Sequence, residues 1–180
     1  MSDTKVATRY AKALIDLANE NNALEAIMND MVLLDRVIDE NPELEAIMNN
    51  PIVSLDKKVG ILNAVFAGNV NAVTSSYFKV LVNKGRSDVL YSTAKEFIRQ
   101  YQVQKGIVKA EVTSATALTE EARTTFKAIV KKELGAEEVL LNEKVDDKLI
   151  GGFILKVGDR QFDASMSGSL SKLRKEFAGK

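Results

Sequence analysis

The sequence contains no cysteine and no histidine among its 180 residues. Without cysteine, the chain can form no disulfide, no thiolate metal site and no cysteine nucleophile. Without histidine, it lacks the commonest general base, the commonest metal ligand and the usual activator of a serine nucleophile. An enzyme would have to work with carboxylates, lysine or tyrosine alone. The two absences therefore argue against catalysis, and we predict a non-enzymatic protein with no cofactor and no metal.

The chain also has no excess of one charge, because 25 lysine and arginine residues balance 25 aspartate and glutamate residues. A formal net charge of zero gives no general attraction to nucleic acid or anionic lipid, so we predict no nucleic-acid partner. Long hydrophobic runs are missing too: the longest, Leu149–Leu155, is far shorter than the about 20 residues that span a bilayer. Apolar residues near the N-terminus are spaced rather than continuous, unlike those of a signal peptide.

Proline is scarce, with two residues in the chain, and abundant alanine, leucine, lysine and glutamate favour helix. Asn41 and Ser54 stand at N-cap positions, and Gly85 is a helix stop signal. Since each apolar stripe must be buried against neighbours, residues 1–105 are predicted to form a six-helix bundle. The six segments with apolar residues at helical spacing are 6–18, 24–38, 41–48, 54–68, 71–84 and 87–101.

The period of the apolar residues changes near Gly106. Residues 107–112 alternate between apolar and polar sides, which predicts a half-buried strand, and the segment "VLLNEKV" alternates again further on. Between the two strands, Thr119 can cap a helix that Gly135 ends. We therefore predict a mostly α protein, in which the bundle is followed by a small α/β domain at residues 106–180.

The segment "LIGGFILKVGDRQFDASMSGSLSKLRKEF" begins with two adjacent glycines. A phosphate-binding loop would need a lysine followed by a serine or threonine at a set distance from these glycines, and a dinucleotide-binding motif would need a third glycine at the start of a helix. Neither pattern is present, so nucleotide binding is not predicted. "FILKV" and "RQFD" instead predict a hairpin around Gly158–Asp159. The double glycine indicates a bulge or a close backbone approach. Ser165 or Ser167 can cap a final helix with the apolar stripe Met166, Leu170, Leu173 and Phe177.

Two functional alternatives fit the residues less well. Catalysis by paired carboxylates would need two acids in a cleft, and Asp146–Asp147, the only adjacent aspartate pair, lies in a predicted turn. A helical nucleic-acid-binding module would need a basic face with aromatic platforms, but here the lysines and arginines are scattered among acids.

The first and fifth predicted helices have apolar arcs wider than one core contact needs. Such a surplus could form a groove for a partner helix, or the residues could face two neighbours within the bundle; the residues alone leave both readings open. In the fifth helix the arc comprises Val73, Tyr77, Phe78, Val80, Leu81 and Val82.

Three segments resemble one known family, in order and in spacing along nearly the whole chain. "RYAKALIDLA" lies in the first helix, "LVNKGR" ends the fifth, and "IGGFILKVGDRQFDASMSGSLSKL" spans the hairpin and final helix. Together they resemble the delta subunit of F-type ATP synthases, whose mitochondrial counterpart is the oligomycin-sensitivity-conferring protein. The resemblance implies a non-catalytic stator (peripheral-stalk) subunit that links the catalytic head to the b subunits, so that proton-driven rotation is coupled to ATP synthesis. The alternative is a generic helical adaptor that binds an amphipathic helix of another complex.

The resemblance also implies partners and a location. The N-terminal helix of an alpha subunit is expected in a groove between the first and fifth helices, and the C-termini of the b subunits are expected on the C-terminal domain. The protein would lie at the cytoplasmic face of a bacterial membrane, attached only through the complex. The residues expected to line or support the groove are Tyr10, Ala13, Leu14, Tyr77, Phe78, Leu81 and Val82. Those expected on the b-subunit side are Gly151, Gly152, Met166, Leu170 and Leu173.

Overall fold

The computed structural model describes residues 3–170. The chain divides into two compact units between Tyr101 and Gln102, within the last turns of the sixth helix rather than after it. Each unit is described by itself. The described residues are mostly helical and include one small mixed sheet, which confirms the predicted fold class.

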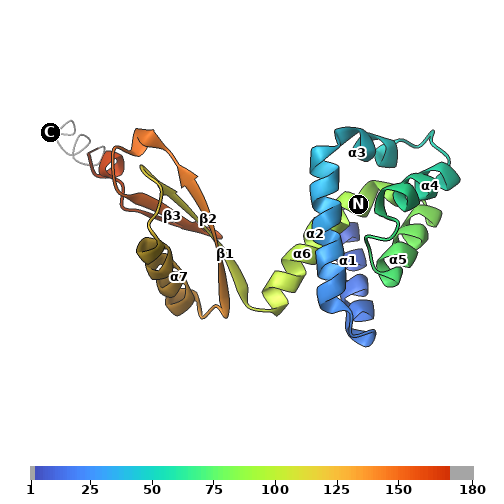
Figure 1. Ribbon diagram of the computed structural model, residues 1–180, viewed down its shortest axis with the longest axis horizontal. Helices are drawn as coiled ribbons and strands as arrows, with labels where there is room; N and C mark the ends of the chain where they lie inside the picture. The colour runs from blue at the N-terminus through green and yellow to red at the C-terminus, as the bar shows by residue number, and fades with distance from the viewer. Residues whose placement is uncertain (1–2, 171–180) are drawn as a thin grey trace. The chain divides into compact units, whose positions relative to one another are not determined.

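The first unit contains six α-helices and one short 3-10 helix, drawn in blue to yellow-green in Figure 1. All six predicted helical segments are present, with short turns between them. Their bounds are α1 Asp3–Glu20, α2 Leu24–Glu40, α3 Pro42–Asn49, α4 Leu55–Phe66, α5 Ala72–Asn83, η1 Ser87–Val89 and α6 Leu90–Gln104.

The core of this unit is made by the apolar stripes of the helices. On α2, the buried apolar residues recur every three or four positions, so one face of the helix is removed from water. Burying a side chain such as Leu34 contributes about 1.5–3 kcal/mol. Small residues dominate the buried face of α1, and they let a neighbouring helix approach its backbone. The buried residues of these two helices are Ala7, Ala11, Leu14, Ile15 and Ala18 on α1, and Ile27, Met31, Leu34 and Ile38 on α2.

Two buried polar side chains tie the helices together. The Asp30 carboxylate of α2 accepts hydrogen bonds from the backbone N–H of Asn71 (2.8 Å) and from the Thr74 hydroxyl (2.5 Å). It therefore caps the N-terminus of α5 from another helix, where its negative charge complements the helix dipole. Lys58 Nζ of α4 donates to the Met48 carbonyl of α3 at 2.7 Å and to Ser87 Oγ at 2.8 Å.

Two predicted helix caps, Asn41 and Ser54, are not formed by their side chains. Asn41 lies at the N-cap position of α3 with Pro42 following, but its side chain forms no cap there. The Asn41 amide donates instead to the Val37 carbonyl, near the end of the preceding helix. Ser54 also precedes α4 without a side-chain cap bond. Gly85 follows α5 with φ +67°, as predicted for a helix stop.

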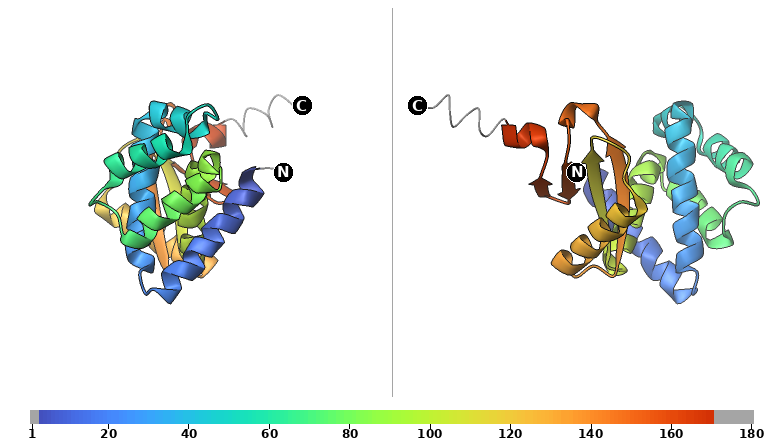
Figure 2. Two further views of the ribbon diagram at one scale, coloured as in Figure 1. Left: turned by 90° about the vertical axis from the view of Figure 1, so that its right-hand side faces the viewer. Right: turned by 60° about the vertical axis from the view of Figure 1, so that its left-hand side comes forward.

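Up to residue 170, the second unit is built of a four-stranded sheet with one long helix, α7, on one face (Figures 1 and 2). The strand order is β2-β1-β3-β4; β1 and β2 are parallel and are joined through α7, while β3 runs antiparallel to β1 and forms a hairpin with β4. Helical backbone resumes at residues 166–170. The bounds are β1 Ile107–Ser114, α7 Glu120–Leu134, β2 Glu138–Val145, η2 Asp147–Leu149, β3 Phe153–Val157 and β4 Arg160–Asp163.

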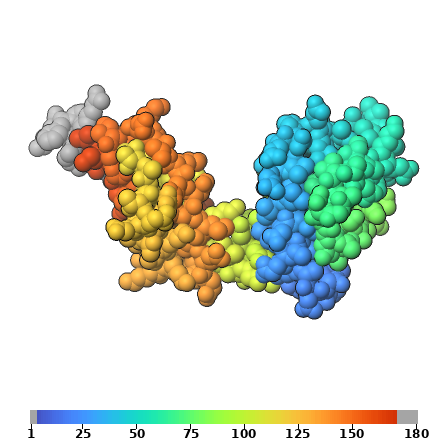
Figure 3. Space-filling view, viewed as in Figure 1, coloured from blue at the N-terminus to red at the C-terminus, as the bar shows by residue number. Residues whose placement is uncertain are grey.

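Helix α7, gold in Figure 3, is fixed to the sheet by apolar and polar contacts. Phe126 and Val130 pack on Ala110 and Val112 of β1. The predicted Thr119 cap is confirmed: its side chain accepts from the Ala122 N–H at 3.3 Å.

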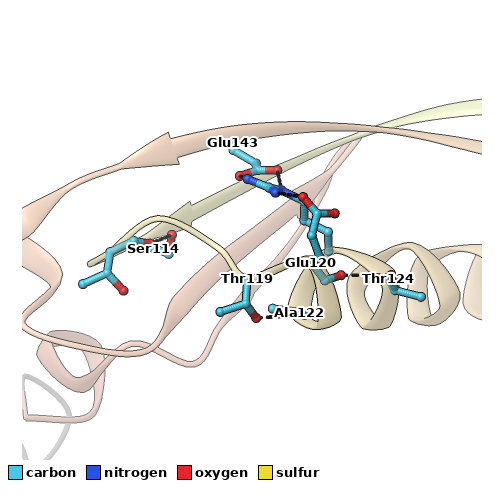
Figure 4. A network of polar contacts seen from close by, with 8 residues as sticks. Ser114, Thr119, Glu120, Ala122, Thr124 and Glu143 are labelled. Carbon is cyan, nitrogen blue, oxygen red and sulfur yellow. Dashed lines mark hydrogen bonds and ion pairs between the residues drawn. The ribbon is translucent and has the colours of Figure 1, made fainter.

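A polar network at the start of α7 joins the helix to β2 (Figure 4). The Arg123 guanidinium contacts Glu143 of β2, with Nε to Oε1 at 2.5 Å, and it also pairs with Glu120 one turn earlier on α7. The hydrogen bonds from Arg123 hold the pKa of the Glu143 carboxyl below its usual value.

Candidate protein-binding sites

Helices α1 and α5 are connected at the surface of the first unit by a tyrosine pair. The Tyr77 hydroxyl of α5 donates a hydrogen bond to the Tyr10 carbonyl of α1 at 3.2 Å. Both tyrosines are half-buried, so each presents part of its ring to solvent. Burial, together with the neighbouring Tyr10 phenol, raises the pKa of the Tyr77 hydroxyl above its usual value.

The seven residues expected at the alpha-subunit groove fall into two groups. Ala13 is exposed and Tyr10 and Tyr77 are half-buried, so these three side chains are accessible. The other four have at most 3% of their surface exposed and belong to the core beneath, namely Leu14, Phe78, Leu81 and Val82. These four side chains pack within the bundle, so we expect them to support a binding surface rather than to line it.

Two accessible apolar side chains were not among the expected binding residues. Leu17 is one turn beyond Ala13 on α1 and is 38% exposed; Val80 is one turn beyond Tyr77 on α5 and is 52% exposed. Residues three or four apart share a helix face. We define the α1–α5 surface as Tyr10, Ala13 and Leu17 on α1 with Tyr77 and Val80 on α5. Their helical spacing was visible in the sequence, but their exposure depends on where the neighbouring helices pack.

In the second unit, Gly151 and Gly152 allow a close backbone approach, as predicted. A Cβ atom on Gly152, which has φ +77°, would lie 2.2 Å from the Ala164 carbonyl oxygen. A Cβ on Gly151 would lie 2.8 Å from the sulfur of Met166. The Met166 N–H donates to the Gly151 carbonyl at 2.9 Å. The glycines therefore hold the start of β3 against the start of the final helix.

The final helix begins at a well-defined cap. Ser165 is buried, and its Oγ accepts from the Gly168 N–H at 3.0 Å, which confirms the predicted cap. Asp163 in turn accepts from the Ser165 hydroxyl at 2.6 Å. Met166 and Leu170 are 59% and 57% exposed. Leu173, the remaining residue expected on the b-subunit side, lies outside the described residues.

An apolar recess between α7 and the β3–β4 hairpin was not expected from the sequence. Its volume is about 690 Å³. Phe126 contacts Phe153 edge to face along it, with ring centroids 4.7 Å apart, and the Phe153 ring lies 6.3 Å from the tilted Phe162 ring. Phe162, on the edge strand β4, is 63% exposed. Its apolar lining consists of Phe126, Ile129, Val130, Leu134, Phe153, Leu155, Val157 and Phe162.

The carboxylate pair considered as a catalytic alternative lies in a turn, as predicted. Asp146 Oδ1 accepts from the Lys148 N–H at 3.0 Å, which caps the short helix η2. Within residues 3–170, no helix is long and apolar enough to cross a membrane.

Comparison with known proteins decides the family. Residues 6–177 match the model of the ATP synthase delta (OSCP) subunit family. The chain belongs to this family.

Delta subunits from other organisms resemble the chain over nearly its full length. It is 44% identical to ATP synthase subunit delta of Cytophaga hutchinsonii, over 98% of this chain and 96% of that protein. It is 36% identical to ATP synthase subunit delta of Flavobacterium psychrophilum, over 99% of each chain.

A solved structure shows the same fold as this delta-family chain. A chain of the Toxoplasma gondii mitochondrial ATP synthase hexamer superposes with a TM-score of 0.71 and 19% identity, covering 96% of this chain and 97% of the other. The family match and the delta-subunit relatives confirm the resemblance stated from the three sequence motifs.

Proposed function

We propose that this chain is the delta subunit of an F-type ATP synthase and acts as a non-catalytic stator subunit. It would hold the catalytic head to the peripheral stalk, so that rotation driven by ion flow changes the catalytic sites instead of turning the whole head. The observation that carries this proposal is the family match over residues 6–177, which includes both structural units.

The α1–α5 surface is the proposed site for the N-terminal helix of the alpha subunit. An amphipathic helix binds where apolar side chains are exposed in a row along neighbouring helices. Leu17 and Val80 supply exposed apolar area, and Ala13 is a small exposed residue that lets a helix approach closely. The Tyr10–Tyr77 contact fixes the two helices relative to each other, so the surface is formed before a partner arrives.

The C-termini of the b subunits are the proposed partners of the second unit. Met166 and Leu170 expose apolar surface beside Gly151 and Gly152. The glycines would act by fixing the backbone rather than by touching the partner. Association with the cytoplasmic face of the bacterial membrane would then follow from these protein contacts, through the complex.

The alternative, an adaptor for an amphipathic helix of another complex, would use the same α1–α5 surface. Titration of the purified full chain with a peptide of the cognate alpha-subunit N-terminus separates the two. A saturable one-to-one complex is expected, whereas a scrambled peptide of the same composition should not bind. A chain that binds neither peptide, or both equally, would contradict the stator assignment. Mg-ATP at millimolar concentration should give no saturable heat, because the proposed role involves no nucleotide.

A further inference from the structure

The apolar recess of the second unit has the size and lining of a small-molecule site. Its volume of about 690 Å³ lies within the range of about 300–1,000 Å³ that is usual for such sites. They are mostly apolar, with a few polar groups that orient the ligand. Three phenylalanines and five aliphatic residues line this recess, and its polar lining is Glu133, Arg160 and Gln161. Ile129 of α7 and Phe162 of β4 are 46% and 63% exposed, so both walls are open to solvent.

The recess is apolar at one end and polar at the other. Its floor follows β3 from Phe153 to Val157, a length of about 13 Å for five residues. At the first end, Phe126 contacts Phe153 edge to face. At the other end, Val157 pairs with Arg160 across the hairpin. A ligand that matches this gradient has an apolar body and a polar head.

The polar end carries two opposite charges on opposite walls. Arg160 lies on the recess face of β4, because side chains two apart on a strand share a face and Phe162 lines the recess. Helix α7 joins the parallel strands β1 and β2, so it runs antiparallel to β1 and in the direction of β3. Glu133, about two turns after Phe126 on α7, therefore lies toward the same end as Arg160.

Neither charge is neutralised by a neighbour. Glu133 and Arg160 are both exposed, and within residues 3–170 neither forms an ion pair or a side-chain hydrogen bond. The two walls thus offer one free cation and one free anion beside an apolar floor. A head group with both charges complements this arrangement, whereas a head group with a single charge faces one like charge.

We propose that the apolar recess binds a single-chain zwitterionic amphiphile of the lysophospholipid class. The acyl chain lies along β3 toward the Phe126–Phe153 end. The phosphate contacts the Arg160 guanidinium, and the ammonium group contacts the Glu133 carboxylate. This inference does not depend on the stator role, because it uses only side chains of the second unit.

The probe is dodecylphosphocholine, kept below the concentration at which it forms micelles. Nuclear magnetic resonance of the isotope-labelled full chain should show saturable shifts at amides of β3, β4 and the second half of α7. In calorimetric titration, Phe162→Ser should reduce the affinity by roughly tenfold or more, because one large apolar contact is lost. The matched control is Leu140→Ser, which should leave the affinity unchanged. Leu140 is a 42% exposed leucine on β2 and lies on the sheet face opposite to the buried Val139.

The head group is tested by changing charge on each side of the contact. Arg160→Gln should weaken binding of dodecylphosphocholine several-fold, as expected for an exposed charge pair. Lys156→Gln should not, because Lys156 lies between Leu155 and Val157 on β3 and faces away from the recess. Dodecyl phosphate and dodecyltrimethylammonium have the same chain with a single charge, and each should bind more weakly than the zwitterion.

Four results would overturn the proposal. Shifts that do not saturate, or that lie on other elements, would leave the recess to a protein partner. Tighter binding of either singly charged amphiphile would refute the zwitterionic head group. Unchanged affinity in Phe162→Ser, or an equal loss in Leu140→Ser, would place the ligand elsewhere. If Phe162→Ser did not fold, Ile129→Ser on the opposite wall would still have to weaken binding.

Discussion

The substitution Ala13→Asp tests the α1–α5 surface with little risk to the fold. Ala13 is exposed on α1, so in the free chain the new carboxylate stays in water. The cost to the free chain is mainly helix propensity, less than about 0.7 kcal/mol. For a unit of this size, that lowers the melting temperature by at most about 3–6 °C.

In the complex, the same carboxylate would be placed against the apolar stripe of the partner helix. Removing an unpaired charge from water costs several kcal/mol unless it is neutralised. A loss of about 3 kcal/mol corresponds to roughly a hundredfold weaker binding, since each ~1.4 kcal/mol is a factor of ten. The substitution should therefore weaken the free energy of peptide binding far more than the free energy of unfolding of the free chain.

The assay is calorimetric titration of the full chain with the cognate alpha-subunit N-terminal peptide, together with thermal melting followed by circular dichroism. Ala64→Asp is the matched control, because Ala64 is also an exposed helical alanine but lies on α4. The control should bind as the wild type does. If Ala13→Asp keeps its helical spectrum and binds the peptide with unchanged affinity, the alpha-subunit helix does not bind at this surface.

Three further predictions concern stability. Asp30→Ala leaves the Thr74 hydroxyl and the Asn71 N–H without their buried acceptor. Chemical denaturation should therefore show a free energy of unfolding lower by about 1–3 kcal/mol. A decrease below about 0.5 kcal/mol, the lower end for a net hydrogen bond, would show that Asp30 does not stabilise α5. Gly152→Ala places a Cβ 2.2 Å from the Ala164 oxygen on a left-handed backbone, so its melting temperature should drop, whereas Gly158→Ala, with open space around the same atom, should cost less. Glu143→Gln should lower the melting temperature at neutral pH, because it removes a carboxylate that Arg123 stabilises. Since Arg123 lowers the pKa of this carboxyl in the folded protein, the stabilisation is present at neutral pH and is lost as pH falls through the folded pKa. A melting-temperature difference between variant and wild type that is as large in acid as at neutral pH would contradict this.

The sequence was a good guide wherever a local pattern determines structure. The change of apolar period near Gly106 located the passage from helix to strand, and Gly158–Asp159 located the hairpin turn. Thr119 and Ser165 cap helices as predicted, because a cap is a local contact between a hydroxyl and an N–H two or three residues on. Ser54, in the same position before α4, makes no such bond.

The sequence was a poor guide where the outcome depends on packing. Leu14 and Ala13 are adjacent in one wide apolar arc, yet Leu14 is buried and Ala13 is exposed. The apolar periodicity predicts which residues lie at the centre of the buried face, but the packing of the neighbouring helices determines which residues at its margins are exposed to solvent. Asn41 shows the same limit for caps, because two helices adjoin it and its amide bonds to the earlier one.

The positive φ of Ile150 had no signal in the sequence either. A turn before two glycines would ordinarily place a glycine or asparagine at the left-handed position, and here an isoleucine occupies it. The conformation is set by contacts on both sides of the turn, from Asp147 and from residues 164–166. Only the three-dimensional arrangement reveals it.

The most direct test of the stator role is a reconstitution. ATP synthase in membrane vesicles from the source organism is depleted of this subunit, and ATP synthesis driven by an imposed ion gradient is measured before and after the purified chain is added. The wild-type chain should restore gradient-driven synthesis, and Ala13→Asp should require far more protein to do so. Gradient-driven synthesis that is unaffected by depletion, or that is not restored by the wild-type chain, would contradict the central claim.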